Sequence, residues 1–211
     1  MAVITIARQF GAGGKTLGRM IRDRLGYTLI DEEIVEMIAM ESNVSTEDVN
    51  MIAKETGNEG VLSKLVHRLG PFRKGYVDID MESKPGYIDG DLYISLLYRV
   101  IPEIAKHDNV IFLGRGSQYI LEDHPDTCHF LMVADLEHRI DFMMQVYDLD
   151  RKKAEAVIKK QGNRRHNLYY YLDKTDYDEP HRYHMVFNMN RVKMEEAAQA
   201  VYQLVTERTS P

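Results

Sequence analysis

Hydrophobic residues in this chain form short apolar runs, and each run leads into a segment with helical periodicity. "AVITIA", residues 2–7, is rich in β-branched residues and typical of a buried central strand. From Thr16 on, apolar residues recur every three or four positions, which predicts an amphipathic helix ended by Gly26. "YTLID", residues 27–31, predicts a second strand, followed by a helix over residues 32–40. Two successive strand–helix units indicate a parallel sheet with right-handed crossovers.

The alternation of strands and helices returns in the second half of the chain. Residues 41–90 interrupt it with polar helical stretches and a segment rich in Gly, Pro and charge, which predicts an insertion on the sheet. The sequence therefore predicts an α/β fold in a single domain over residues 1–211. Further strands are predicted in "NVIFLGRGS" (109–117), "CHFLMVAD" (128–135) and "MVFNMN" (185–190), and further helices over residues 91–107, 136–161 and 192–207.

Composition and charge narrow the class of protein. With 211 residues and 44% hydrophobic composition, the chain can bury one substantial core. A formal net charge of -6 argues against a nucleic-acid binder, since neutralising phosphates needs a broad basic field. No apolar run approaches the roughly 18 residues of a membrane span, and residues 1–5 lead directly into a strand without a basic leader. We therefore expect a cytoplasmic protein with no membrane partner, in which the lone Cys128 lies in the core.

A glycine-rich segment, "RQFGAGGKTLG" (8–18), follows the first predicted strand. It departs from the phosphate-loop pattern G-x-x-x-x-G-K-[ST], because Gln9 stands where the first glycine belongs. Gly11, Gly13 and Gly14 still let backbone N–H groups converge on one point, and the helix N-terminus adds partial positive charge. The segment predicts a phosphate site; the alternative is a tight strand-to-helix turn that needs positive φ.

Charged residues also follow the other predicted strands. Asp31 ends the second strand, Arg115 follows the next, and Asp135 and Arg139 follow the one after. Ligands of open parallel sheets bind beyond the carboxyl ends of the strands. We therefore expect these charged residues to gather around the glycine-rich segment.

Four segments, taken together and in order, resemble the cytidylate kinase-like family of P-loop nucleoside monophosphate kinases. They are "VITIARQFGAGGKTLGRMIRDRLGYTLIDEEIV", "VIFLGRGSQYIL", "FLMVADLEHRI" and "MVFNMNRVKMEEA". The resemblance implies a three-layer P-loop kinase fold with a central parallel sheet, and transfer of a phosphoryl group from ATP to a nucleoside monophosphate of the CMP or dCMP type, assisted by Mg²⁺. It further implies that residues 41–90 bind the acceptor and that residues 148–182 form a lid.

The loop of these kinases resembles G-x-x-G-A-G-K-G-T, and aligning the shared G-A-G displaces the lysine of this chain by one residue. Gly14 then stands at the lysine position, Lys15 at the next glycine, and Thr16 at the threonine. At a helix start, one position turns the side-chain direction by about 100°. Arg8 lies in the slot of the first glycine and is a candidate substitute cation; the alternative is an ordinary solvated arginine.

The resemblance also implies a role for each candidate residue. The residues expected to bind the donor are Arg8, Gly11, Ala12, Gly13, Gly14, Lys15 and Thr16, of which Thr16 would also bind the metal. The residues expected to bind the acceptor are Asp31 and Arg115. The residues expected to take part in catalysis are Lys15, Arg139, Arg164 and Arg165. Each role has a structural alternative. Asp31 could cap the following helix, Arg115 could form a surface ion pair, and the other arginines could belong to a solvated basic face.

Two other functions remain open at this stage. One is a regulatory protein that binds nucleotide without turnover, which fits the displaced Lys15 and the Gly116 that replaces the aspartate of the family's G-R-D segment. The other is a kinase for a non-nucleotide acceptor, bound by residues 41–90. In each case the expected partners are small molecules, and homo-oligomer formation stays open.

Overall fold

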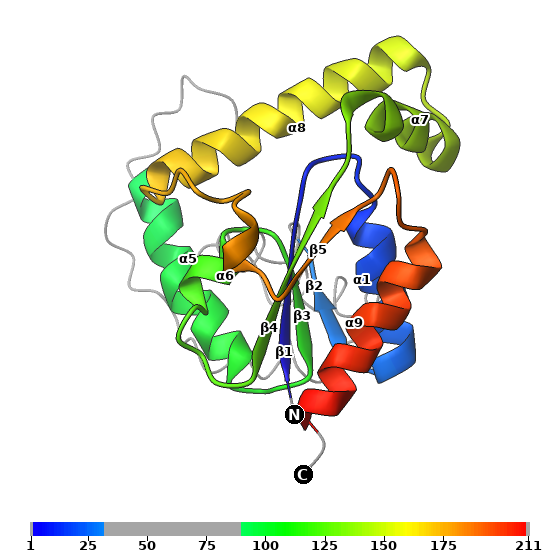
Figure 1. The fold of residues 1–211 in the computed structure, drawn as a ribbon. Coiled ribbons are helices and arrows are strands. Elements are labelled where there is room, and N and C mark those ends of the chain that lie inside the picture. Colours follow the sequence, from blue (N-terminus) through cyan, green and yellow to red (C-terminus); the bar gives the residue numbers. More distant parts are fainter. Residues whose placement is uncertain (1, 32–89, 210–211) are drawn as a thin grey trace, which may run out of the picture.

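The computed structural model describes residues 2–31 and 90–209, which form a parallel sheet with helices on both faces (Figure 1). The predicted helix over 32–40 and nearly all of the predicted insertion over 41–90 lie outside the described residues. The strands follow the order β2-β3-β1-β4-β5 and every pair is parallel. They are β1 (Val3–Arg8), β2 (Thr28–Ile30), β3 (Val110–Leu113), β4 (Thr127–Val133) and β5 (Met185–Asn188).

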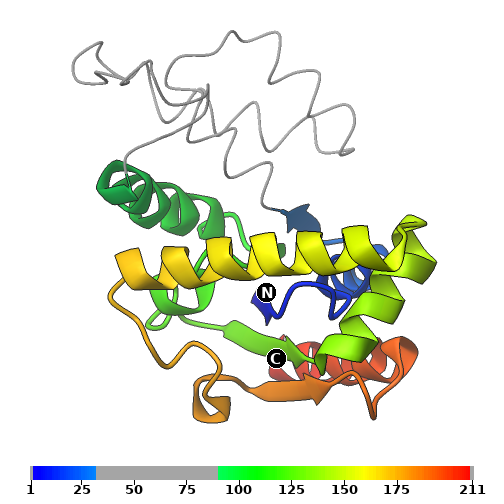
Figure 2. The ribbon, with the colours of Figure 1, turned by 90° about the horizontal axis from the view of Figure 1, so that it is seen from above.

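The helices lie in two layers around the sheet, with one long helix above it. Figures 1 and 2 show α1 and α9 on one side, α5 and α6 on the other, and α8 crossing above the carboxyl ends of the strands. The predicted α/β fold with a central parallel sheet is confirmed. The helices are α1 (Gly14–Leu25), α5 (Gly90–Ala105), α6 (Ser117–Ile120), α7 (Leu136–Tyr147), α8 (Arg151–Tyr171) and α9 (Met194–Thr209).

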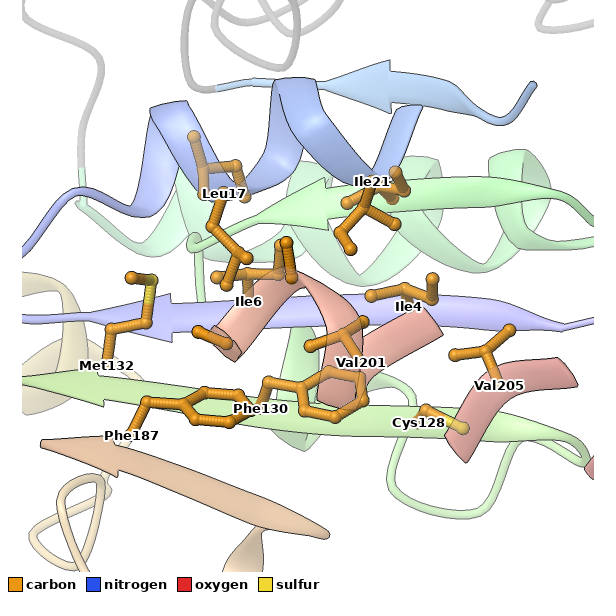
Figure 3. Packing of buried hydrophobic residues seen from close by; sticks show 14 of the residues in the cluster. Ile4, Ile6, Leu17, Ile21, Cys128, Phe130, Met132, Phe187, Val201 and Val205 are labelled. Carbon is orange, nitrogen blue, oxygen red and sulfur yellow. The ribbon is translucent and has the colours of Figure 1, made fainter. Parts of the chain in front are cut away.

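Side chains of β1 alternate between the two layers. Ile4 and Ile6 pack among the residues of α1 and α9, as Figure 3 shows, while Val3 packs with α5 on the opposite face. Cys128 is fully buried in the first of these clusters. A strand buried on both faces needs an apolar run without polar alternation, and "AVITIA" is such a run. Because β1 is the central strand, its carboxyl end lies at the middle of the sheet's upper edge, which is the edge formed by the carboxyl ends of the strands below α8.

The segment predicted as one helix over 136–161 is two helices in the structure. Asp148 takes a left-handed conformation with φ 53°, which ends α7. Asp150 then caps α8, its carboxylate accepting a hydrogen bond from the Lys153 N–H at 2.8 Å. The new helix runs on to Tyr171. Helical periodicity alone missed this break, because the aspartates act through local capping and not through the apolar pattern.

Two glycines allow the effect of backbone conformation to be measured without a packing change. A Cβ would meet nothing within 4 Å at Gly26 or at Gly162, but Gly26 has φ 69° and Gly162 lies within α8. We expect Gly162→Ala to raise the free energy of unfolding by about 0.5–1 kcal/mol, and Gly26→Ala to lower it by about 1–2 kcal/mol. Urea unfolding measures both; equal shifts for the two variants would contradict the assigned conformations.

His129 of β4 belongs to a buried polar cluster on the sheet. Its Nδ1 lies 2.7 Å from Thr5 Oγ1, and its backbone N–H donates to His184 Nδ1 at 3.0 Å. Arg208 Nη1 lies 2.7 Å from His184 Nε2. Burial, together with the charges of His184 and Arg208, lowers the pKa of His129 to about 4. His129 is therefore neutral in the folded protein near neutral pH.

The buried neutral His129 makes stability depend on pH. The unfolded chain binds a proton at His129 near pH 6.5, whereas the folded chain does so only near pH 4. The contribution is therefore complete above about pH 6.5 and lost as pH falls toward 4. We expect the free energy of unfolding to drop by about 2 kcal/mol between pH 7.5 and pH 5. His129→Gln should flatten this dependence in urea titrations; an unchanged slope would contradict it.

Within residues 2–31 and 90–209, no helix is both long enough and apolar enough to cross a membrane.

Candidate active site

The loop between β1 and α1 presents the start of a helix to the upper edge of the sheet. Gly11 and Gly13 have φ 90° and 86°, and Gly13 is the N-cap of α1. No acidic residue lies in the first turn of α1. The first N–H groups of a helix have no intrahelical acceptor, and the helix dipole places positive charge there. The loop therefore has the backbone and the charge to bind an anion.

Gln9 ties the loop to β4 in place of the glycine that the phosphate-loop pattern requires. Its backbone N–H donates to the Met132 carbonyl at 3.0 Å, and its side-chain Oε1 accepts from the Ala134 N–H at 3.1 Å. The Gln9 carbonyl also accepts from the Ala12 N–H at 3.1 Å, which closes the turn. Sequence reasoning recorded Gln9 only as a departure from a pattern. The structure gives it a positive role in fixing the loop.

Arg139 fixes the other side of the loop. Its Nη1 donates to the Phe10 carbonyl at 3.3 Å, and its Nε donates to the Asp135 carbonyl at 3.3 Å. A Cβ at Gly11 would lie 2.9 Å from Arg139 Cβ, so only glycine permits this approach. Burial lowers the pKa of Arg139, Asp135 opposes this, and Arg165 lowers the pKa further. The structure thus places Arg139 beside the loop, bonded to its backbone.

Lys15, the second residue of α1, forms an ion pair with the residue that follows β2. Its Nζ lies 3.1 Å from Asp31 Oδ2, at the end of β2. The two side chains are 34% and 16% exposed, so the pair is partly shielded from water. The sequence predicts that both residues lie near the loop, and the structure brings them together as a pair that the sequence does not predict.

Arg8, the last residue of β1, crosses the floor of the site. A Cβ at Gly14 would lie 2.9 Å from Arg8 Cγ, and a Cβ at Gly114 would lie 1.9 Å from Arg8 Nη1. The side chain therefore runs past the start of α1 to the turn after β3. The pKa of Arg8 is lowered to about 10, mainly by burial and also by the cations of Arg115 and Arg165, while Tyr169 and Asp31 oppose this.

The turn after β3 has three consecutive residues in the left-handed region. Gly114, Arg115 and Gly116 have φ 76°, 60° and 69°. For Arg115 this conformation costs about 1–3 kcal/mol, which the surrounding packing must offset. A Cβ at Gly116 would lie 2.4 Å from Leu172 Cδ1, so the end of α8 closes on the turn. A strained arginine held between two glycines is typical of a functional site.

Arg164 and Arg165 are neighbours in α8 but have different surroundings. Arg165 makes a two-pronged contact with Asp178, at 3.1 Å and 2.5 Å, and lies over the rings of Tyr169 and Tyr177. Burial opposes the charge of Arg165, but the hydrogen bond and charge of Asp178 prevail, with Tyr169 adding to them, and its pKa is raised. Arg164 is exposed and lines the cleft below α8. Arg165 thus helps to hold the segment after α8 against α8 itself.

A buried hydrogen-bond network anchors the end of α8 to α6. Gln118 Nε2 donates to the Tyr169 hydroxyl at 2.8 Å and lies 3.3 Å from the Tyr183 hydroxyl. The Tyr169 ring stacks on Tyr177 with centroids 4.2 Å apart. Nothing in the sequence pattern marked Gln118 or Asp178 as part of the site. Both act through residues distant along the chain, which periodicity does not detect.

Two adjoining hollows lie between the loop, the turn after β3 and α8. The larger is a cleft of about 510 Å³ that reaches the loop, Lys15 and Asp31; the smaller reaches Gly114, Arg115 and Arg165. Of the remaining loop residues, Ala12 is buried at 1% exposure and Thr16 is partly exposed on the first turn of α1. Residues lining both hollows are Arg8, Phe10, Gln161 and Arg164.

The parallel sheet, the glycine loop between its central strand and α1, and the helix above the site define a P-loop kinase fold. The chain belongs to the cytidylate kinase-like family, whose model matches residues 3–191. No curated protein matches the sequence significantly.

Solved structures with a similar fold share little sequence with this chain. An uncharacterised protein from Eubacterium ventriosum superposes with a TM-score of 0.67 at 15% identity, over 98% of each chain. A shikimate kinase from Acinetobacter baumannii gives 0.48 at 13% identity, over 100% of this chain and 96% of that one. A gluconokinase from Sinorhizobium meliloti gives 0.47 at 11% identity, over 98% and 94%.

Proposed function

We propose that this protein is an ATP-dependent kinase that phosphorylates a nucleoside monophosphate of the CMP or dCMP type. Membership of the cytidylate kinase-like family supports a small-molecule kinase. The observation that carries the proposal is the start of α1, whose N-cap is a left-handed glycine and whose first turn faces a cleft bordered by arginines. Backbone N–H groups at such a helix start bind phosphate.

The donor phosphates of ATP fit the loop. Gly13 and Gly14 line the cleft without side chains, so phosphate oxygens can approach the backbone closely. Lys15 and Arg8 border the same cleft and supply positive charge. Thr16, partly exposed on the first turn of α1, would reach the Mg²⁺ ion, which when bound neutralises charge on the β- and γ-phosphate oxygens.

The acceptor is assigned to the side of the site between β2 and the turn after β3. Arg115 presents a guanidinium suited to two-pronged binding of the acceptor phosphate. Asp31, paired with Lys15, would bind a polar group of the nucleoside. Both residues lie beyond the carboxyl ends of strands, where parallel sheets bind ligands.

Catalysis by these residues would rest on positioning and charge. Phosphoryl transfer builds charge on oxygens around the transferred phosphorus, and fixed cations stabilise it. Arg164, exposed on α8 above the cleft, can deliver such charge directly. Arg165 and Arg139 would assist from α8 and from behind the loop, where each is held by hydrogen bonds. The segment over residues 148–182 would act as a lid that excludes water.

Incubation with ATP, Mg²⁺ and a panel of acceptors tests this function. We expect ADP to form only when an acceptor is present, with CMP and dCMP preferred among the nucleoside monophosphates. The panel includes shikimate and gluconate as non-nucleotide alcohols. Transfer to one of these alone would replace the acceptor in the proposal, and ATP binding without transfer to any acceptor would contradict a kinase.

A nucleotide-binding protein without turnover is the second candidate. The Lys15–Asp31 pair favours it, because the only lysine of the loop is engaged by a carboxylate at 3.1 Å. In that case calorimetry would show ATP binding, while the acceptor panel would yield no ADP above the level without acceptor.

A further inference from the structure

Arg8 occupies a path that two glycines on separate elements leave open. Its Cγ and Cδ lie 2.9 Å and 3.0 Å from a Cβ placed at Gly14, and its Nη1 lies 1.9 Å from a Cβ placed at Gly114. Gly14 is not in the left-handed region, so backbone conformation does not require a glycine there. The close approach of the Arg8 stem is what requires a glycine at position 14. The start of α1 and the turn after β3 are therefore both shaped around this one side chain.

The path ends where the donor and acceptor sides of the site meet. Arg8 lines the larger cleft, which contains the loop and Lys15, and also the smaller one, which contains Arg115. A phosphoryl group that moves from ATP on the loop to an acceptor held by Arg115 must pass between these two hollows. Within the part of the chain that the structure describes, Arg8 and Phe10 are the residues of the glycine-rich segment 8–18 that line both hollows. Arg8 is the charged one of the two.

The electrostatic surroundings of Arg8 favour an anion. Burial makes the charge of Arg8 costly to keep, and the cations of Arg115 and Arg165 near its guanidinium add to that cost, while Tyr169 and the Asp31 carboxylate oppose it. A bound phosphoryl group would bring negative charge to the Arg8 guanidinium, whose planar shape matches the geometry of phosphate oxygens.

Lys15 is oriented toward a different partner. Its ammonium lies 3.1 Å from the Asp31 carboxylate, which partly neutralises its charge. Asp31 follows β2, which lies on the far side of β3 from β1 in the sheet order. Lys15, the second residue of α1, is thus engaged by a carboxylate that lines the same cleft.

We propose that Arg8, and not Lys15, is the catalytic cation that binds the phosphoryl group during transfer. The inference rests on the proposed function. In the reaction an oxygen of the acceptor phosphate, which enters deprotonated, forms a bond to the γ-phosphorus. The bond from phosphorus to the bridging oxygen breaks, and ADP leaves with its electron pair. Arg8 donates N–H groups to the oxygens of the transferred group and exchanges no proton.

Two variants, each with a neutral methionine in place of a cation, test whether Arg8 and not Lys15 binds the phosphoryl group. Arg8→Met keeps the stem over Gly14 and removes the charge, and Lys15→Met does the same at the loop. With the best acceptor of the panel, we expect Arg8→Met to lower kcat at least about 100-fold and Lys15→Met less than about tenfold. The reverse order would overturn the proposal. Circular dichroism and thermal unfolding check that each variant folds.

A conservative pair covers the case in which Arg8→Met does not fold. Arg8→Lys keeps the charge but loses the two-pronged guanidinium, and we expect it to lower kcat at least about tenfold. Lys15→Arg keeps a charge beside Asp31, and we expect it to lower kcat less than Arg8→Lys does. Equal effects of the two conservative variants would overturn the role of Arg8.

Binding of MgATP separates failure of this inference from failure of the proposed function. If the native protein binds MgATP but no acceptor yields ADP, the kinase proposal fails, while binding of the terminal phosphate by Arg8 and not by Lys15 is still tested. Calorimetry should then show at least about tenfold weaker binding for Arg8→Met, and less than about threefold for Lys15→Met. Equal binding by both variants overturns the inference, and a native protein that binds no MgATP overturns both proposals.

Discussion

Gly114→Ala is expected to lower the rate of phosphoryl transfer at least about 100-fold, equivalent to about 2.7 kcal/mol of barrier. The added Cβ would lie 1.9 Å from Arg8 Nη1, so the guanidinium has to leave its position at the junction of the two hollows. The loss of stability should be modest, because the end of a side chain can move while the main chain stays in place. Steady-state kinetics and urea unfolding measure the two effects.

Gly26→Ala is the matched control for Gly114→Ala. Both glycines lie in the left-handed region, with φ 69° and 76°, but a Cβ at Gly26 would meet nothing within 4 Å. Both variants should lose about 1–2 kcal/mol of unfolding free energy, and only Gly114→Ala should lose activity. Full activity of Gly114→Ala would show that the position of Arg8 does not matter.

Arg115→Ala is expected to lower kcat/KM for the acceptor at least about 100-fold and to change the affinity for MgATP less than about threefold. Arg115 lines the smaller hollow, which the loop glycines and Lys15 do not line, so its guanidinium can bind the acceptor phosphate apart from the donor. Alanine would take the same backbone conformation, with φ 60°, as Arg115 does, so the substitution changes the side chain and not the backbone. Acceptor titrations at saturating ATP, together with calorimetry of MgATP binding, separate the two affinities.

Arg191→Ala controls for the loss of one positive charge. Arg191 is exposed in the turn before α9, where its backbone N–H donates to the Asn188 carbonyl at 2.9 Å. We expect this variant to keep its kinetics for donor and acceptor. Equal loss of MgATP and acceptor binding in Arg115→Ala would contradict the separate role of Arg115.

The sequence predicted the parallel sheet, and it predicted a candidate site at the carboxyl ends of the strands, because both follow from short-range patterns. "AVITIA" and "VIFL" are apolar without alternation, as strands buried on both faces require. Gly11 and Gly13 marked the loop, and both have positive φ in the structure. The rule that parallel strands bind ligands at their carboxyl ends placed Asp31 and Arg115 near it. This rule applies here because every strand of the described sheet is parallel to its neighbours.

The sequence did not predict how individual side chains are engaged. The Lys15–Asp31 pair, the bond from Gln9 to Ala134 and the contact of Arg165 with Asp178 all depend on tertiary packing. Arg164 and Arg165 look alike in the sequence, yet helix geometry turns neighbouring side chains by about 100° and gives them different surroundings. Residue type therefore indicated charge at the site, and only the structure assigned partners.

The position of Arg8 depends on information that is spread over the chain. Gly14 and Gly114 are separated by the whole of β2 and α5, and neither alone signals room for an arginine. A glycine in the phosphate loop is explained by backbone conformation at Gly13, but at Gly14 it is explained by the Arg8 stem. The sequence identifies Arg8 as a candidate cation. Its close approaches to Gly14 and Gly114 in the structure show where its side chain runs.

The most direct test is a crystal structure of the protein with Mg²⁺ and a non-hydrolysable analogue of ATP. We predict that the terminal phosphates lie over the backbone N–H groups of Gly13 to Thr16, with the Arg8 guanidinium within about 3 Å of a γ-phosphate oxygen. Lys15 should remain paired with Asp31. Phosphates bound away from this loop, or contacted by Lys15 with Arg8 turned aside, would contradict the phosphate site and the role of Arg8.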